Sequence, residues 1–272
     1  MSKLTKKKII IVGYKSFIQS NLSNHLKKKY KIQKIKFNDL NQYNISDADF
    51  IINCSNSKSF FYKQYLKNSD RNLKIANLIK KTRTKFIILS TRQVYDPKLN
   101  ITERSKLKPI NMYAKNCLKS ENFCKKIIKN KLLILRLSNV IGYEIGNKKK
   151  PSLMSIIIKS LKNKKIYFDN NYILKKDFLP IKFLCLCIEK LIQKKIVGIV
   201  NIGTGIPVTV KELIKTIVDL KRVKIVIKLK NNFKDNHFCY KLNKFEKLTK
   251  IKINKKQLLK YFSNLRREIN KI

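Results

Sequence analysis

The stretch KIIIVGYKSFIQSNL, residues 8–22, decides the fold. Residues 8–12 form a β-branched apolar run, which is typical of a fully buried parallel strand, and Gly13 follows the run at once. From Phe17 to Leu26 the apolar residues recur with the spacing of one helical face. A strand, a glycine and a helix in this order form the turn at which dinucleotide phosphates bind backbone N–H groups. Taken alone, this signal is weak.

Strands and helices alternate along the first half of the chain. Apolar runs predict strands at residues 31–37, 49–54, 85–89 and 132–137, and helical spacing predicts helices at 71–81 and 112–129. Alternation of this kind indicates βαβ units with right-handed crossovers, which build a parallel sheet.

The pattern changes after Gly142. We expect a loop at 143–151, strands at 165–168, 198–202 and 223–229, and helices at 153–161, 181–194, 210–220 and 255–270. The sequence therefore predicts an α/β protein whose first part, residues 1–150, is a Rossmann-type doubly wound parallel sheet. Residues 176–202 are expected to return to that sheet. Residues 151–175 and 203–272 are expected to form a smaller α+β portion that binds substrate.

The charge of the chain is extreme. Its 272 residues include 64 Lys and Arg against 16 Asp and Glu, a formal net charge of +48, yet 43% hydrophobic residues suffice for a sizeable core. Such a field attracts any polyanion. The lysines are spread along the whole chain, only eight of the cations are arginines, and no basic segment carries interleaved aromatic residues. This pattern disfavours nucleic acid as the partner.

Signals for membranes, secretion and metals are weak. No stretch approaches the roughly 20 apolar residues of a membrane span, and the apolar run at residues 9–12 is too short for a signal peptide. The six cysteines form no C-x-x-C pair. We therefore expect buried reduced thiols, no metal site and a cytoplasmic protein.

Six segments, in the right order, resemble the extended short-chain dehydrogenase/reductase superfamily and its NAD-dependent epimerase/dehydratase group, which acts on nucleotide sugars. Gly13, Ser16 and Gln19 fall at the three glycine positions of the family's G-x-x-G-x-x-G turn, so only one glycine is kept. The other five segments are N-C-S-N at 53–56, S-T-R-Q-V-Y at 90–95, R-L-S-N-V-I-G at 136–142, D-F-L at 177–179 and N-I-G-T-G at 201–205.

The resemblance implies NAD or NADP as the cofactor. The residues that would bind it are those of the turn, the strand-end segment and the catalytic tyrosine: Gly13, Ser16, Phe17, Ile18, Asn53, Cys54, Ser55 and Tyr113. Asp39, near the end of the second strand, would bind the adenosine ribose, whereas Lys34 and Lys36 would favour a 2′-phosphate. The choice between NAD and NADP stays open.

The resemblance also implies catalytic and substrate residues. Tyr113 takes the place of the catalytic tyrosine, Thr91 is the first candidate for the hydroxyl that bonds the reacting sugar oxygen, and Ser90 is the second. Asn139 would contact the nucleotide sugar, together with Thr91. The family activates its tyrosine with a lysine four residues later, where this chain has Cys117. A neutral thiol supplies no cation to lower a tyrosine pKa from its usual value near 10.

Two functions follow from these observations. The first is an NAD(P)-dependent oxidoreductase, epimerase or dehydratase that transfers hydride to or from a nucleotide-activated sugar. The chain length and Asn53-Cys54-Ser55 favour a sugar reductase similar to dehydrorhamnose reductases. The second is a dinucleotide- or sugar-nucleotide-binding protein that has lost the chemistry, which Ser16, Gln19 and Cys117 favour. The resemblance also allows a homodimer through the helix that carries Tyr113.

Overall fold

The structure is a computed structural model that describes residues 6–143, 154, 157, 164–168, 170–218, 223–227 and 236–269. The loop predicted at 143–151 lies outside the described residues except for Tyr143. The helix predicted at 153–161 lies outside them except for Met154 and Ile157, which are helical.

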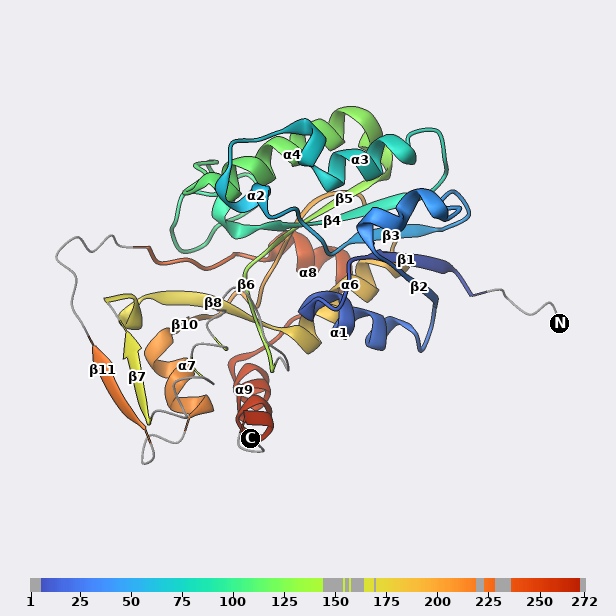
Figure 1. Ribbon diagram of the computed structural model, residues 1–272. Coiled ribbons are helices and arrows are strands. Elements are labelled where there is room, and N and C mark those ends of the chain that lie inside the picture. The colour runs from blue at the N-terminus through green and yellow to red at the C-terminus, as the bar shows by residue number, and fades with distance from the viewer. Residues whose placement is uncertain are drawn as a thin grey trace.

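A six-stranded parallel sheet forms the centre of the molecule (Figure 1). Its strands are β1 (Lys8–Val12), β2 (Lys31–Ile35), β3 (Phe50–Asn53), β4 (Lys85–Thr91), β5 (Leu132–Leu137) and β9 (Gly198–Ile202). They lie in the order β2-β1-β3-β4-β5-β9 and every neighbouring pair is parallel. The predicted Rossmann-type sheet is thereby confirmed. The strand order reverses between β1 and β3, and such a reversal is where this architecture binds ligands.

Helices cover both faces of the sheet (Figure 1). On one face lie α2 (Ser59–Tyr62), α3 (Arg71–Leu78) and α4 (Met112–Ile128), and on the other lie α1 (Phe17–Leu26) and α6 (Ile181–Gln193). Successive residues of β1 therefore enter different cores: Ile9 and Ile11 pack with the cluster that includes α1, whereas Ile10 and Val12 pack with the cluster that includes α3. Burial on both faces explains why this strand is an unbroken apolar run.

Most of the remaining elements form a smaller portion beside the central sheet (Figure 1). β6 (Asn139–Ile141), β8 (Lys175–Pro180) and β10 (Pro207–Thr209) form a three-stranded sheet, and β7 (Lys165–Phe168) pairs in parallel with β11 (Lys224–Ile227). In this portion α7 (Val210–Ile217) packs on α9 (Lys255–Ile269), whereas α8 (Asn243–Thr249) packs on β9 and α6 at the central sheet. β6 follows β5 directly, and β8 leads directly into α6, so both strands connect this portion to the central sheet.

Some expectations need correction. The sequence predicts no strand between residues 168 and 181, but residues 175–180 form β8, and β6, β10 and α8 were not expected as separate elements. Between β2 and β3 the described residues form a 3₁₀ helix at Phe37–Gln42 and no α-helix. Among the described residues, no helix is long and apolar enough to cross a membrane. The same residues contain no group of three or more His, Cys, Asp and Glu that could hold a metal ion.

Candidate functional site

The predicted site residues gather at the carboxyl ends of the central strands. Gly13 follows β1, Cys54 follows β3, Thr91 ends β4, and Asn139 lies two residues beyond β5. Because the strands are parallel, these ends share one edge of the sheet. Residues from separate motifs therefore come together at one place.

The turn after β1 depends on its glycine. Gly13 has φ +148°, a backbone conformation that other residues rarely adopt, and a Cβ built there would lie 3.5 Å from the Cβ of Cys54. Ser16 caps α1, since its hydroxyl accepts a hydrogen bond of 3.3 Å from the Gln19 backbone N–H. The serine at the second glycine position thus stabilises the start of the helix. Gln19, at the third glycine position, is buried.

A cavity of about 540 Å³ opens beside this turn and reaches Lys15, Lys36 and Asp39. The ammonium groups of Lys36 and Lys15 lie 4.9 Å and 5.3 Å from the centre of the exposed Tyr14 ring. The Asp39 carboxylate is half-buried and makes no side-chain hydrogen bond or ion pair with the described residues. A helix N-terminus with two lysines suits phosphates, and an available carboxylate suits ribose hydroxyls. These residues fit the adenosine and diphosphate parts of a dinucleotide.

The segment after β3 has a structural role of its own. The buried Asn53 side chain donates a hydrogen bond of 2.7 Å to Asn72 and accepts bonds from the backbone N–H and the hydroxyl of Ser55. The Cys54 backbone N–H bonds to the Val12 carbonyl. Asn53 therefore shapes the loop that faces Gly13, while its own amide points into the protein. Asn72 is a buried polar residue that the sequence analysis missed.

The two candidate hydroxyls on β4 have different surroundings. Ser90 donates a hydrogen bond of 2.5 Å to the carboxylate of Glu121 on α4, and Glu121 in turn pairs with the buried Arg136. Thr91 is the next residue, so its side chain leaves the strand on the opposite face. The Thr91 hydroxyl accepts a bond of 3.3 Å from the Gln93 backbone N–H and keeps its own proton for another partner. Of the two hydroxyls, that of Ser90 donates to a carboxylate, whereas that of Thr91 donates to none of the described residues.

Tyr113 is the second residue of α4, and its ring stacks on Phe61 with the centroids 4.7 Å apart. Burial, and to a smaller extent the neighbouring Cys117 thiol, raises the pKa of Tyr113 well above its ordinary value. Burial also raises the pKa of Cys117, so this thiol stays protonated. Among the described residues, no lysine or arginine hydrogen bonds to Tyr113. The local environment therefore disfavours the phenolate.

Arg92 is a site residue that sequence reasoning missed, because the motif leaves its position open. It begins a 3₁₀ turn (Arg92–Val94) directly after Thr91. Its Nε donates a hydrogen bond of 2.9 Å to the amide oxygen of Asn139, and its guanidinium lies 4.6 Å from the centre of the Phe238 ring. The amide nitrogen of Asn139 donates to the backbone oxygen of Asp177. Both ends of the Asn139 amide are thus engaged within the protein.

Two buried hydrogen-bond networks, around Arg136 and Asp177, lie next to the candidate site residues. The Arg136 guanidinium bonds Glu121 and the hydroxyl of Tyr95, and that hydroxyl donates to Asn201. The fully buried Asp177 carboxylate accepts hydrogen bonds from Thr204, Gly205, Ser138 and the Tyr240 backbone. These bonds connect β8 to the N-I-G-T-G loop after β9 and hold the strand ends in register.

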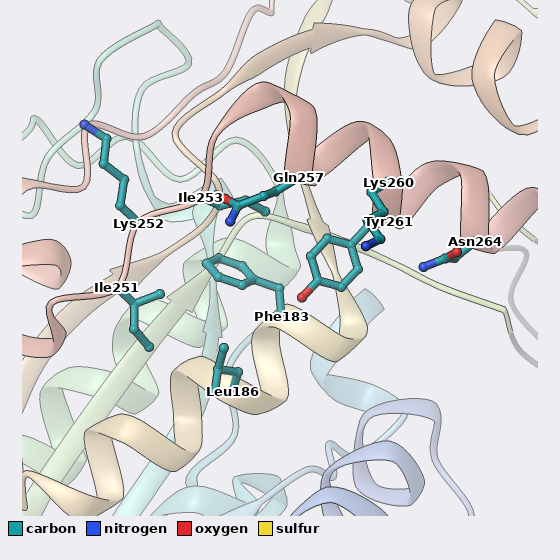
Figure 2. Close-up of a pocket in the computed structure, with 9 residues that line it drawn as sticks. All are labelled: Phe183, Leu186, Ile251, Lys252, Ile253, Gln257, Lys260, Tyr261 and Asn264. Atoms are coloured by element: carbon teal, nitrogen blue, oxygen red, sulfur yellow. The ribbon is translucent and has the colours of Figure 1, made fainter.

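A second hollow, of about 380 Å³, lies between α6 and α9 (Figure 2). The rings of Phe183 and Tyr261 and the side chain of Leu186 face one another across it, and Lys252 and Lys260 stand at its border. None of the residues that the sequence analysis selected lines this hollow.

Solved structures share this fold over almost their whole length. The dTDP-glucose 4,6-dehydratase of Bacillus anthracis str. Ames, in complex with NAD, is 18% identical, with a TM-score of 0.78 and 97% of each chain covered. The UDP-N-acetylglucosamine 4-epimerase of Methanobrevibacter ruminantium M1 is 17% identical, with a TM-score of 0.83, and the match covers 99% of this chain and 100% of that one. The UDP-glucuronic acid 4-epimerase of Bacillus cereus, in complex with UDP-glucuronic acid and NAD, is 18% identical, with a TM-score of 0.77 and 97% and 99% covered.

No curated protein matches the sequence. The sequence profile of the NAD dependent epimerase/dehydratase family, in contrast, matches residues 4–203, about three quarters of the chain. The matched range contains the turn at Gly13, both hydroxyls of β4, Tyr113 and Asn139, and it agrees with the fold. The chain therefore belongs to the NAD dependent epimerase/dehydratase family.

Proposed function

We propose that this protein binds NAD or NADP together with a nucleotide-activated sugar and transfers hydride to or from a carbon of the sugar. One observation carries the proposal: Gly13 and Thr91 come from separate motifs and lie at the carboxyl ends of parallel strands, and Asn111, which caps the helix of Tyr113, bonds Gln93 just beyond Thr91. The Bacillus anthracis structure contains NAD, and the Bacillus cereus structure contains both NAD and UDP-glucuronic acid.

In this proposal the cofactor lies against the turn after β1. Gly13, Ser16 and the first helical residues Phe17 and Ile18 hold the diphosphate, Asp39 binds the ribose, and the backbone of Cys54 and Ser55 borders the cofactor on the other side. The bound nicotinamide would supply the hydride donor or acceptor. Lys15 and Lys36 place positive charge beside Asp39 and would attract a 2′-phosphate, so NADP needs to be tested beside NAD.

The sugar would lie between the Thr91 hydroxyl and Tyr113. Thr91 would orient the reacting oxygen with its available proton, and Tyr113 would hold or move the proton on that oxygen. Asn139 would border the nucleotide sugar at the start of β6. Ser90 is the weaker candidate because its hydroxyl is bonded to Glu121.

The reductase branch of the family stays a prediction. The chain length was one reason to favour it, yet the chain spans 97–100% of the length of the dehydratase and epimerase structures it matches. Length therefore does not separate the reductase from the other two reactions.

A second function is favoured by one specific observation: the Cys117 thiol lies one helical turn from Tyr113 on α4 and raises the pKa of the tyrosine. Since both groups stay protonated and no cation contacts them among the described residues, proton transfer at Tyr113 would be slow. Loss of a positioned acid–base group costs about 10²–10⁴ in rate. The second candidate is therefore a protein that binds the cofactor and the nucleotide sugar but turns them over poorly.

The deciding experiment is a titration of the purified protein with NADH and NADPH, at low salt and at roughly 0.5 M salt, where the Debye length is only a few ångströms. We expect micromolar binding that survives the salt, because a built site acts at contact distance. Binding that disappears with salt would be attraction to the +48 charge alone and would contradict the proposal. Turnover of UDP- and dTDP-sugars, with Tyr113→Phe as the control, then separates the two functions.

A further inference from the structure

The guanidinium of Arg92 is only partly used by the protein. Its Nε bonds Asn139, and its face stacks on the Phe238 ring. Among the described residues, no acceptor bonds the two Nη groups, which carry four of the five N–H donors of an arginine. Burial lowers the pKa of Arg92, and the charge of Asp177 offsets only part of this effect.

The Asp177 carboxylate, which attracts Arg92, is already hydrogen bonded to other groups. Asp177 directs its two carboxylate oxygens to Thr204, Gly205, Ser138 and Tyr240, and offers Asn139 only its backbone oxygen. Asp177 therefore attracts Arg92 without forming an ion pair with it.

The position of Arg92 lies between the parts of the proposed substrate site. It follows Thr91 directly, and Gln93, on its other side, accepts a hydrogen bond of 2.9 Å from Asn111. Asn111 caps α4, two residues before Tyr113. Through Asn139, Arg92 is also tied to β6 and β8 of the smaller portion. A ligand that bridges Thr91 and Asn139 would meet the free edge of the guanidinium.

We propose that Arg92 binds an anionic group of the nucleotide-sugar substrate, either a carboxylate on the sugar or the diphosphate. The inference rests on the proposed function and adds a specificity residue to it. The planar fork of arginine matches carboxylate and phosphate oxygens with two parallel hydrogen bonds. The bond to Asn139 and the Phe238 ring fix the plane of the fork, so little side-chain freedom remains to be lost on binding.

The test measures ligand binding by calorimetry, at roughly 0.15 M salt, to the whole protein and to Arg92→Gln, Arg92→Lys and Arg83→Gln. The ligands are UDP-glucuronic acid, UDP-glucose and dTDP-glucose. Arg83 is the matched control, since it is exposed and precedes the opposite end of β4. Its replacement removes the same charge from the same molecule. Thermal unfolding confirms that each variant is folded.

We expect Arg92→Gln to weaken binding about 10- to 100-fold, the effect of losing a hydrogen-bonded charge, and Arg92→Lys to recover part of it. Loss confined to UDP-glucuronic acid assigns Arg92 to the sugar carboxylate, and equal loss for all three ligands assigns it to the diphosphate. A folded Arg92→Gln variant that binds every ligand as the unaltered protein does overturns the inference alone. So does an Arg83→Gln variant that is weakened equally. Failure of the unaltered protein to bind any of the three contradicts the proposed function, and the inference falls with it.

Discussion

The contact between Tyr113 and Cys117 places a thiol where proton transfer needs a cation. Replacement of Cys117 by lysine should lower the pKa of Tyr113, because an ammonium group one helical turn away stabilises the phenolate. We expect turnover of nucleotide sugars to rise by up to about 10²–10⁴, the usual contribution of an acid–base group. The pKa is measured as the difference in tyrosinate absorbance between Cys117→Lys and Cys117→Lys/Tyr113→Phe.

Cys117→Met is the control, since it adds length at the same position without charge. A Cys117→Lys variant that folds, lowers the Tyr113 pKa and still shows no gain in turnover would mean that Tyr113 is not the acid–base group. A gain shared by Cys117→Met would assign the effect to packing in place of charge.

The neighbouring hydroxyls of β4 give a second prediction. Ser90→Ala should lower the free energy of unfolding by about 1–3 kcal/mol, because it removes a donor from the buried Glu121 carboxylate. Thr91→Ala should cost less stability than Ser90→Ala, because it removes only the 3.3 Å bond from the Gln93 backbone N–H, and it should lower turnover or sugar binding. Chemical denaturation and binding measurements on both variants check this division. If Ser90→Ala leaves stability unchanged and reduces binding, Ser90 is the ligand-binding hydroxyl and the assignment to Thr91 is wrong.

The helices α1 and α6 are joined by the nearly buried Glu189 of α6. His25, in the last turn of α1, and Lys29, just after the helix, donate hydrogen bonds of 2.6 Å and 2.5 Å to its carboxylate. Burial alone would raise the pKa of Glu189, but these two partners outweigh it and lower the pKa below its usual value. The contacts of Glu189 with His25 and Lys29 therefore hold α1 against α6. The other end of α1 follows the turn at Gly13.

Because the pKa of Glu189 is lowered, its contacts with His25 and Lys29 stabilise the fold less as the pH falls. Their stabilising effect is present above the pKa of an unfolded glutamate, about 4.3, and is lost as the pH falls through the lower folded value. Glu189→Gln should thus melt several degrees below the unaltered protein at pH 7, and the gap should narrow below about pH 4.5. Glu268→Gln is the control, because its ion pair with Lys182 is exposed. A gap that stays constant with pH would show that the charge of Glu189 is not what stabilises these contacts.

Among the secondary-structure elements, those with long apolar runs could be predicted from the sequence. The inner strands of the central sheet could be predicted because burial on both faces requires continuous apolar residues, as in residues 9–12. β8 could not be predicted, because its sequence begins K-K-D, which is typical of a solvated loop. In the fold, Lys176 and Asp177 are nevertheless buried, and hydrogen bonds from other segments satisfy the Asp177 carboxylate.

Some residues of the candidate site could likewise be predicted from the sequence, and others could not. The motifs supplied Gly13, Thr91 and Asn139 as candidates, and in the fold these three residues lie at or just beyond the carboxyl ends of β1, β4 and β5. Spacing could not show that Asn53 turns inward to Asn72, or that Arg92 stacks on Phe238, because those contacts join segments far apart in the sequence. Side-chain direction depends on tertiary partners that no local pattern encodes.

For the whole molecule, the net charge of +48 is the dominant long-range term. Like charges at this density repel one another in the compact state, and the repulsion falls when salt shortens the Debye length from about 30 Å at 0.01 M to about 8 Å at 0.15 M. The melting temperature should therefore rise with ionic strength. Scanning calorimetry between roughly 0.01 M and 0.5 M sodium chloride measures the rise.

Sodium acetate at equal ionic strength is the control for this prediction, because screening depends on ionic strength and specific anion binding depends on the anion. Equal rises in both salts would establish self-repulsion, whereas a rise in one salt alone would indicate a bound anion. A melting temperature that stays flat or falls would show that local ion pairs, such as those of Glu189 and Glu121, outweigh the repulsion among the lysines. Since the proposed ligands are anions, the same series sets the ionic strength at which binding reports contacts and not the overall field.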